Sequence, residues 1–331
     1  MKINISTILF LSTLISGTMI VISSKSWILM WMGLEMNLLS FIPLMNQNKT
    51  PYENEAAMKY FIVQAMASLI MLFSILAAGL YEISNAITNT ILLSSLFTKM
   101  GAAPFHLWFP GVMQGLTWMN CFILMTWQKI APMIMMMYQL INGLMSNTII
   151  MISVLAGAIG GFNQTSLRKM MAYSSISHLG WMIMASMMSI KYWIIYFMIY
   201  LILNLSIIII FMKNMIFYLP QIFTQQGSKT NKFSMYISML SLGGLPPFLG
   251  FFPKWLIIQT SMEFESKWLI LIMVMTTMVT LYFYLKVTYS SLLFSNQNMY
   301  WKHEYKMNFI MILSLSISLM GIPIITYMSM Y

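Results

Sequence analysis

The sequence predicts an all-α, polytopic membrane protein with about 11 transmembrane helices. The first observation is composition: 60% of the 331 residues are hydrophobic and only 7% are charged, whereas soluble domains carry about 25% charged residues. The second is that the apolar residues form long continuous runs, and about 20 apolar residues suffice for a spanning helix. Such runs do not resemble the alternating ten-residue strands of a membrane barrel.

The predicted spans follow one another along the whole chain. They are residues 3–22, 27–45, 56–81, 86–108, 120–142, 147–162, 169–189, 191–213, 234–259, 267–290 and 307–328. The first run is longer than the apolar part of a secretory leader, so we expect a span there and not a cleaved leader. The longest connection, residues 214–233, is too short for an independent core. We therefore expect a single membrane domain over residues 1–331.

The basic residues predict the orientation of the spans. With 11 spans the two termini lie on opposite sides, and the Lys and Arg residues other than the intramembrane Lys99, Lys129 and Lys254 divide eleven to three between those sides. The minority side holds Lys25, Lys191 and Lys267. Because basic loops favour the cytosol-equivalent side, the N-terminus is expected there, which is the matrix in a mitochondrion. The net charge of +10 is therefore assigned to loops beside a membrane and not to nucleic-acid binding.

Helix-breaking residues interrupt the fourth and ninth predicted spans. Gly101 and Pro104 lie in a Gly-x-x-Pro-Phe sequence in the fourth span, and Gly244, Pro246 and Pro247 lie in a second such sequence in the ninth. Proline removes a backbone donor and clashes with the preceding turn, so each helix is expected to open there. Backbone groups freed at membrane depth are tolerated only against protein or a water-filled cavity.

The spacing of the two broken spans predicts an internal repeat. They are five spans apart, so they cross the membrane in opposite directions. We expect two five-helix inverted repeats, residues 1–142 and 147–290, with an additional helix at residues 307–328. Paired interrupted helices are a sequence sign of a transport site.

Ionisable side chains lie inside predicted spans, where each costs roughly 2.5–3.5 kcal/mol. Glu35, Lys99 and Lys129 lie deep in their spans, and Lys254 follows the second break. Burial disfavours a charged lysine and a nearby carboxylate favours it, so such a lysine can change protonation when its partner moves. These four residues predict a pathway for protons or ions. His178 is either a polar member of that pathway or a packing residue, and the sequence leaves both interpretations open.

Several cofactor classes are not expected in this chain. The single Cys121 excludes an intrachain disulfide framework and cysteine-ligated iron–sulfur clusters. The three His residues are too scattered for a metal site, and neither glycine-rich nucleotide motif is present. Energy for any pumping must then come from a partner chain or an ion gradient.

Four segments resemble the antiporter-like subunits of respiratory complex I. They are residues 58–65 (MKYFIVQA), 99–108 (KMGAAPFHLW), 168–181 (RKMMAYSSISHLGW) and 243–254 (GGLPPFLGFFPK). The resemblance runs nearly end to end and is to the mitochondrial form of animals, which lacks the first three helices of bacterial members. It implies that Glu35 and Lys99 form a modulating ion pair around a central protonatable lysine. It also implies that Lys129 is a relay, that Lys254 lies near the exit and that His178 connects them.

The same resemblance implies the setting of the chain. It would be a subunit of a proton-translocating NADH:ubiquinone reductase in the mitochondrial inner membrane, without a redox site of its own. Flavin, iron–sulfur clusters and quinone are expected in partner subunits. The expected neighbours are other membrane-arm subunits, including other antiporter-like chains, and lipids such as cardiolipin, with the N-terminus in the matrix and the C-terminus in the intermembrane space.

Two other functions stay open at this point. A free-standing cation/proton antiporter would need the same buried charges but no enzyme partner. A structural subunit that assembles the membrane arm without moving a proton is the second alternative, because part of the first repeat is missing.

Overall fold

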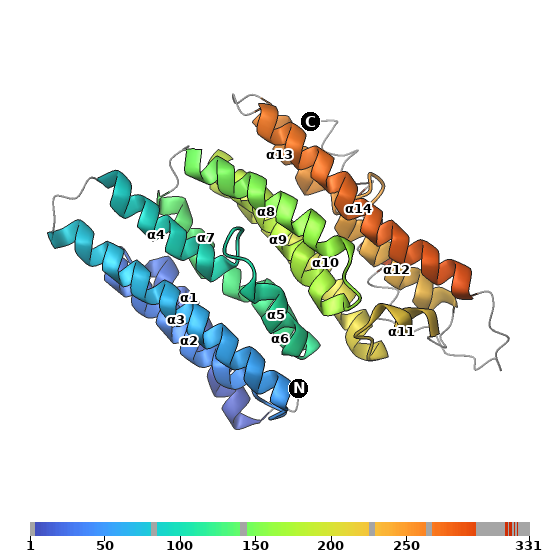
Figure 1. Cartoon of the computed structure of the whole chain (residues 1–331), viewed down its shortest axis with the longest axis horizontal. Helices are drawn as coiled ribbons and strands as arrows, with labels where there is room; N and C mark the ends of the chain where they lie inside the picture. The colour runs from blue at the N-terminus through green and yellow to red at the C-terminus, as the bar shows by residue number, and fades with distance from the viewer. Residues whose placement is uncertain are drawn as a thin grey trace. The chain divides into compact units, whose positions relative to one another are not determined.

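The computed structural model describes residues 4–80, 85–139, 144–224, 229–262 and 267–295, with six positions between 315 and 323. The predicted span at 307–328 therefore lies almost wholly outside the described residues. Within them the chain is helical, and strand pairing is limited to an isolated bridge between Ser166 and Tyr218. Figure 1 shows the course of the helices.

The chain divides into two compact units, Met1–Ser153 and Val154–Tyr331. The helices that begin in the first unit are α1 (Ile5–Ser23), α2 (Trp27–Met45), α3 (Pro51–Leu80), α4 (Asn85–Met100), α5 (Trp108–Gly115), α6 (Trp118–Met125), α7 (Trp127–Gln139) and α8 (Leu144–Phe162). Those of the second are α9 (Leu167–Met188), α10 (Ile190–Asn214), α11 (Leu219–Thr224), α12 (Lys229–Gly243), α13 (Phe251–Ser261) and α14 (Lys267–Ser295).

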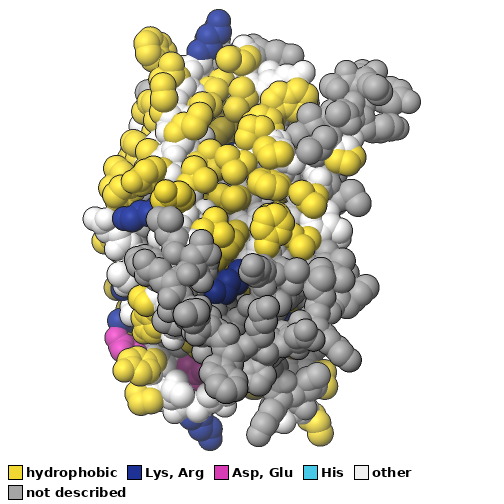
Figure 2. All heavy atoms as spheres, turned by 90° about the vertical axis from the view of Figure 1, so that its right-hand side faces the viewer, with side chains coloured by type: hydrophobic (Ala, Val, Ile, Leu, Met, Phe, Trp, Pro, Cys, Tyr) yellow, Lys and Arg dark blue, Asp and Glu magenta, His cyan; other side chains and the backbone are white. Residues whose placement is uncertain are grey.

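Seven segments of the described chain are long and apolar enough to cross a membrane, judged by length and composition. They are Ile5–Ser23, Trp27–Met45, Pro51–Gly79, Trp118–Gln139, Met145–Phe162, Ile190–Asn214 and Lys267–Leu292. This agrees with a polytopic membrane protein, whereas the total of 11 spans and the inverted repeat stay predictions. Many large apolar side chains face outward, as lipid-facing residues do, and Figure 2 shows such side chains over a broad area of one face.

The structure differs from the predicted spans in three places. A helix, α5, follows the first break where a connection was expected, and α11 forms within the connection 214–233. The predicted span 120–142 is divided at Thr126, which has φ −114° and ψ −70°. The Thr126 hydroxyl donates to the carbonyl oxygen of Phe122 at 2.7 Å, and such side-chain bonds compete with the helical ladder.

In the first unit, α1 and α2 pack with their backbones close together. A Cβ placed on Gly33 would lie 2.7 Å from Cγ2 of Val21 and 2.9 Å from the carbonyl oxygen of Gly17. Small residues permit this approach in membrane helices. The contact fixes the rotation of α2, and with it the directions of the side chains that α2 sends toward α3 and α7.

In the second unit, α9 occupies the centre. It packs against α10 and α13, and sixteen of its 22 residues are buried. Its Ser and His side chains make it too polar to count among the seven apolar segments, although most of its residues are buried. Helix α10 also packs against α12 and α13, the two helices on either side of the second break.

Candidate functional site

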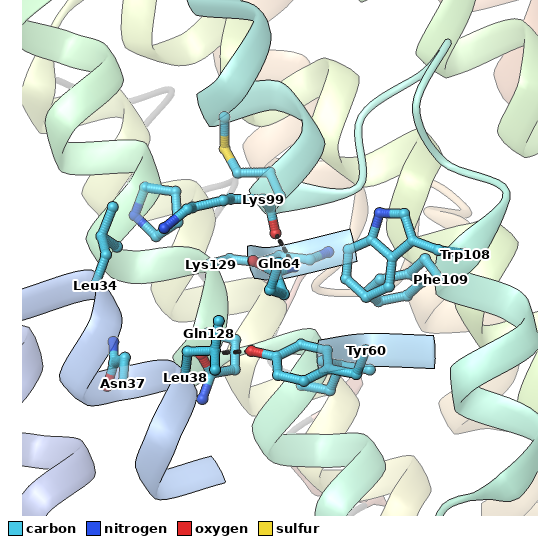
Figure 3. A pocket seen from close by; sticks show the side chains of 13 residues that line it. Leu34, Asn37, Leu38, Tyr60, Gln64, Lys99, Trp108, Phe109, Gln128 and Lys129 are labelled. Atoms are coloured by element: carbon cyan, nitrogen blue, oxygen red, sulfur yellow. Dashed lines mark hydrogen bonds between the residues drawn. The ribbon is translucent and has the colours of Figure 1, made fainter. Parts of the chain in front are cut away.

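Two of the predicted lysines line one small cavity in the first unit. Lys99 lies in the last turn of α4 and Lys129 near the start of α7, and their side chains are 6% and 1% exposed. Figure 3 shows both beside Gln64 and Gln128. The cavity volume is about 20 Å³, and roughly 10–15 Å³ suffices for one water molecule. The site is thus sized for water and not for a quinone or another organic ligand.

Uncharged polar groups form much of the cavity wall. The carboxamide of Gln64 donates to the carbonyl oxygen of Lys99 at 3.2 Å, and the Tyr60 hydroxyl donates to Oε1 of Gln128 at 3.4 Å. Asn37 also lines the cavity, and its buried Oδ1 accepts no hydrogen bond. A water molecule needs two to four polar partners, and these groups can supply them.

Glu35 lies near this cavity but not in its wall. Its Oε1 is buried without a hydrogen-bond partner, and a carboxylate close to a lysine favours the charged form of that lysine. Glu35 and Lys99, both among the described residues, form no ion pair within 4 Å, so the two side chains are not in direct contact. The reason is helical phase: Leu34 and Leu38 face the cavity, and Glu35 is turned about 100° from Leu34.

Lys129 is placed against an aromatic face. Its ammonium lies 5.4 Å from the centroid of the Phe109 ring, which belongs to α5 just after the first break. A cation over an aromatic face is attracted by the ring electrons. The same ring lines the cavity, so the α5 helix that follows the break shapes the surroundings of both lysines.

Both broken helices end in the same backbone turn. Gly101 has φ +74° and Gly244 has φ +89°. In each turn the glycine N–H donates to the carbonyl three residues earlier, and the next N–H donates to the carbonyl five residues earlier, at 3.0–3.4 Å. This is the Schellman arrangement, which glycine favours because it has no Cβ. The prolines Pro104, Pro246 and Pro247 then follow in the connections between helices.

The second unit holds Lys254 and His178. Lys254, 7% exposed, lies in the first turn of α13 and donates from Nζ to the carbonyl oxygen of Gly243 at 2.8 Å. His178, equally buried, has Nδ1 2.8 Å from the hydroxyl of Tyr196 on α10. The Tyr200 ring lies 5.2 Å from the imidazole, centroid to centroid.

The predicted residues thus fall into two groups, with Glu35, Lys99 and Lys129 in the first unit and His178 and Lys254 in the second.

Sequence reasoning missed their polar partners, chiefly Tyr60, Gln64, Gln128 and Tyr196. A signal was present for three of them, because Tyr60 and Gln64 lie in a segment that carries the family resemblance and Gln128 adjoins Lys129. In the described part of the chain, no cluster of three or more His, Cys, Asp or Glu residues could hold a metal ion.

Comparison with curated proteins finds close relatives of full length. The chain is 46% identical over 310 residues to NADH-ubiquinone oxidoreductase chain 2 of Locusta migratoria, covering 92% of this chain and 91% of that protein. It is 48% identical over 333 residues to the protein of the same name from Aedes aegypti, covering 97% of each.

Comparison with solved structures agrees in fold. A chain of respiratory complex I from Thermus thermophilus, solved with bound aureothin, matches with a TM-score of 0.76 at 21% identity. The match covers 96% of this chain and 78% of that one. The model of the transmembrane NADH:quinone oxidoreductase/Mrp antiporter family matches residues 24–280. The chain therefore belongs to the NADH:quinone oxidoreductase/Mrp antiporter transmembrane family.

Proposed function

We propose that this chain translocates protons in the membrane arm of respiratory complex I through a buried relay of Glu35, Lys99, Lys129 and Lys254, with His178 as a connecting group. Its close relatives are chains of NADH-ubiquinone oxidoreductase. The observation that carries the relay is the pair Lys99 and Lys129, two buried lysines on one water-sized cavity. A buried lysine is expensive in a membrane and marks an ion or proton pathway.

The first step of the relay takes place around the cavity. The Glu35 carboxylate attracts the Lys99 ammonium without touching it, so a shift of either group changes the attraction steeply. Moving Glu35 away releases a proton from Lys99, and water in the cavity carries it to Lys129. Tyr60, Gln64 and Gln128 hold that water by hydrogen bonds. Interacting sites of this kind titrate as a set and not one by one.

The later steps use the second unit, where Lys254 receives the proton and His178 provides a polar group between α9 and α10. Electron transfer supplies the energy, and its flavin, iron–sulfur clusters and quinone belong to partner subunits. The partners include other antiporter-like membrane-arm chains and lipids such as cardiolipin. In this proposal the chain supplies the side chains that bind protons, and the redox chemistry takes place in the partner subunits.

Replacement of Lys99 tests the relay. We expect Lys99→Met to lower the number of protons translocated per NADH oxidised, while the NADH:quinone reductase rate in uncoupled membranes stays unchanged. Lys59→Met is the matched control, because the Lys59 side chain is 52% exposed and pairs with exposed Glu55 on the surface of α3. An unchanged proton ratio in fully assembled Lys99→Met complex would refute the relay and favour the structural-subunit alternative.

A native gel of gently solubilised membranes tests the setting. Comigration of this chain with a very large band that oxidises NADH is expected. Migration as a small species without that activity would favour the free-standing antiporter instead.

We also propose 11 spans arranged as two inverted repeats and one additional helix, with the N-terminus in the matrix. Lys25 and Thr50 lie in exposed connections at the two ends of α2, so they face opposite sides of the membrane. Lys25→Cys should react with an impermeant maleimide in mitoplasts, and Thr50→Cys only in inside-out particles. The native Cys121 is buried and gives a low background. The reverse labelling pattern would overturn the orientation.

A further inference from the structure

The two Schellman turns differ in what satisfies their terminal carbonyl groups. At the end of α4, the Gln64 carboxamide donates to the carbonyl of Lys99 and the Trp108 indole to that of Thr98, each at 3.2 Å. Both donors are uncharged and cannot titrate near neutral pH. The first break is therefore held by neutral groups, and the Lys99 ammonium is left to face the cavity.

At the end of α12, the hydrogen-bond donor is Lys254, the residue proposed above to carry a proton. The Lys254 ammonium reaches back from α13 to the carbonyl of Gly243, the last residue of α12, at 2.8 Å. A helix C-terminus carries partial negative charge, so a cation placed there is stabilised. Hydrogen bonds from an ammonium are also shorter and stronger than neutral ones.

Gly244 leaves room for that ammonium. A Cβ on Gly244 would lie 3.0 Å from Nζ and 3.3 Å from Cδ of Lys254. At the equivalent turn, a Cβ on Gly101 would instead meet the rings of Phe109 and Trp108, at 3.2 and 3.4 Å. Both glycines adopt a positive φ, but only at Gly244 would a side chain press on a lysine.

We propose that Gly244 is a positioning residue for Lys254: with the Gly243 carbonyl it forms a seat that holds the ammonium at the end of the broken helix α12. The stability of the turn and the protonation of Lys254 are then coupled, because the bond to the Gly243 carbonyl is charge-assisted only while Lys254 carries its proton. The inference rests on the proposed role of Lys254 as a proton carrier. The first break lacks such a coupling among its described residues, so we assign the link between turn stability and lysine protonation to the second break.

Two glycines of the second unit provide the test in assembled complex I. The added methyl of Gly244→Ala presses on the Lys254 ammonium, at 3.0 Å, and on the carbonyl oxygen of Gly250, at 3.3 Å, whereas that of Gly161→Ala in α8 meets the Phe283 ring, at 3.1 and 3.4 Å. We expect Gly244→Ala to lower the protons translocated per NADH to the value of Lys254→Met, with the quinone KM and the uncoupled reductase rate unchanged. Gly161→Ala should keep the normal ratio. A normal ratio in Gly244→Ala, beside a lowered one in Lys254→Met, would overturn the seat.

If Gly244→Ala fails to assemble, a second measurement tests whether the Lys254 ammonium stabilises the turn at Gly244. Hydrogen exchange at the amides of Gly244 and Leu245 should be about 10- to 100-fold faster in Lys254→Met than in Lys254→Arg. A hydrogen bond to a charged group changes the equilibrium constant for opening of the turn by about that factor. The amides of Gly101 and Ala102 should exchange equally in both variants. Equal exchange at Gly244 would overturn the coupling. A normal proton ratio in Lys254→Met would refute the proposed carrier while leaving the exchange result to decide the seat.

Discussion

The imidazole Nδ1 of His178 lies 2.8 Å from the hydroxyl of Tyr196, in a contact that joins α9 to α10. Tyr196, Tyr200 and Asn204 are spaced by four residues and so share one face of α10. Tyr200 lies within hydrogen-bonding reach of Ser175 and Asn204. A row of polar side chains therefore runs between α9 and α10, and His178 is one of its members.

Removal of the Tyr196 hydroxyl tests the importance of this row of polar side chains. Tyr196→Phe keeps the ring but deprives Nδ1 of its partner, and leaving a buried polar group without its partner costs about 1–3 kcal/mol. We expect lower thermal stability of the chain in the assembled complex and fewer protons translocated per NADH. Thermal inactivation and proton counting on the same preparation measure the two effects.

The control for that variant is Tyr289→Phe on α14, where the side chain is 66% exposed. It removes the same hydroxyl from an outward-facing site and should change neither quantity. Loss of stability without any change in the proton ratio would assign Tyr196 a structural role only.

Glu35→Gln removes the negative charge of this side chain in the first unit but keeps its shape. The carboxylate has a buried oxygen without a hydrogen-bond partner, and an unpaired buried charge is unfavourable. The isosteric amide should therefore leave the stability unchanged or raised, while protons translocated per NADH fall because Lys99 loses its attracting partner. Glu55→Gln is the control, since Glu55 is 62% exposed and surface ion pairs contribute little. An unchanged ratio in Glu35→Gln would remove Glu35 from the relay.

The lengths and positions of most helices could be predicted because they depend on local properties. Continuous apolar runs fix where spans lie, and the Gly and Pro motifs fix where α4 and α12 end. The polar partners of the lysines could not be predicted in this way. Gln64 and Lys99 are 35 residues apart, and Tyr60 and Gln128 are 68 apart, so their contacts depend on how separate helices pack. The lack of direct contact between Glu35 and Lys99 has the same origin, because the rotation of α2 follows from its packing on α1.

Blocking the cavity tests the transfer between Lys99 and Lys129. Leu38 lines the cavity and is 3% exposed, so Leu38→Phe should fill the space that water occupies and lower the protons translocated per NADH. Overpacking of a buried site also costs about 1–3 kcal/mol. Leu39→Phe adds the same ring at a neighbouring position that is 60% exposed and should have no effect. A normal ratio in assembled Leu38→Phe complex would exclude water in this cavity as the carrier.

The close approach of α1 and α2 yields the last prediction, because it fixes the rotation of the helix that carries Glu35. Gly33→Ala would place its methyl group 2.9 Å from a backbone oxygen of α1, which cannot move away as a side chain can. We expect the helices to separate, at about 1–3 kcal/mol, and the proton ratio to fall because Glu35, two residues later, turns relative to Lys99. Gly79→Ala in α3 is the matched control, since its Cβ would meet nothing within 4 Å and alanine suits a helix better than glycine. If Gly33→Ala destabilised the chain without lowering the proton ratio, the rotation of α2 would matter for folding and not for the attraction between Glu35 and Lys99.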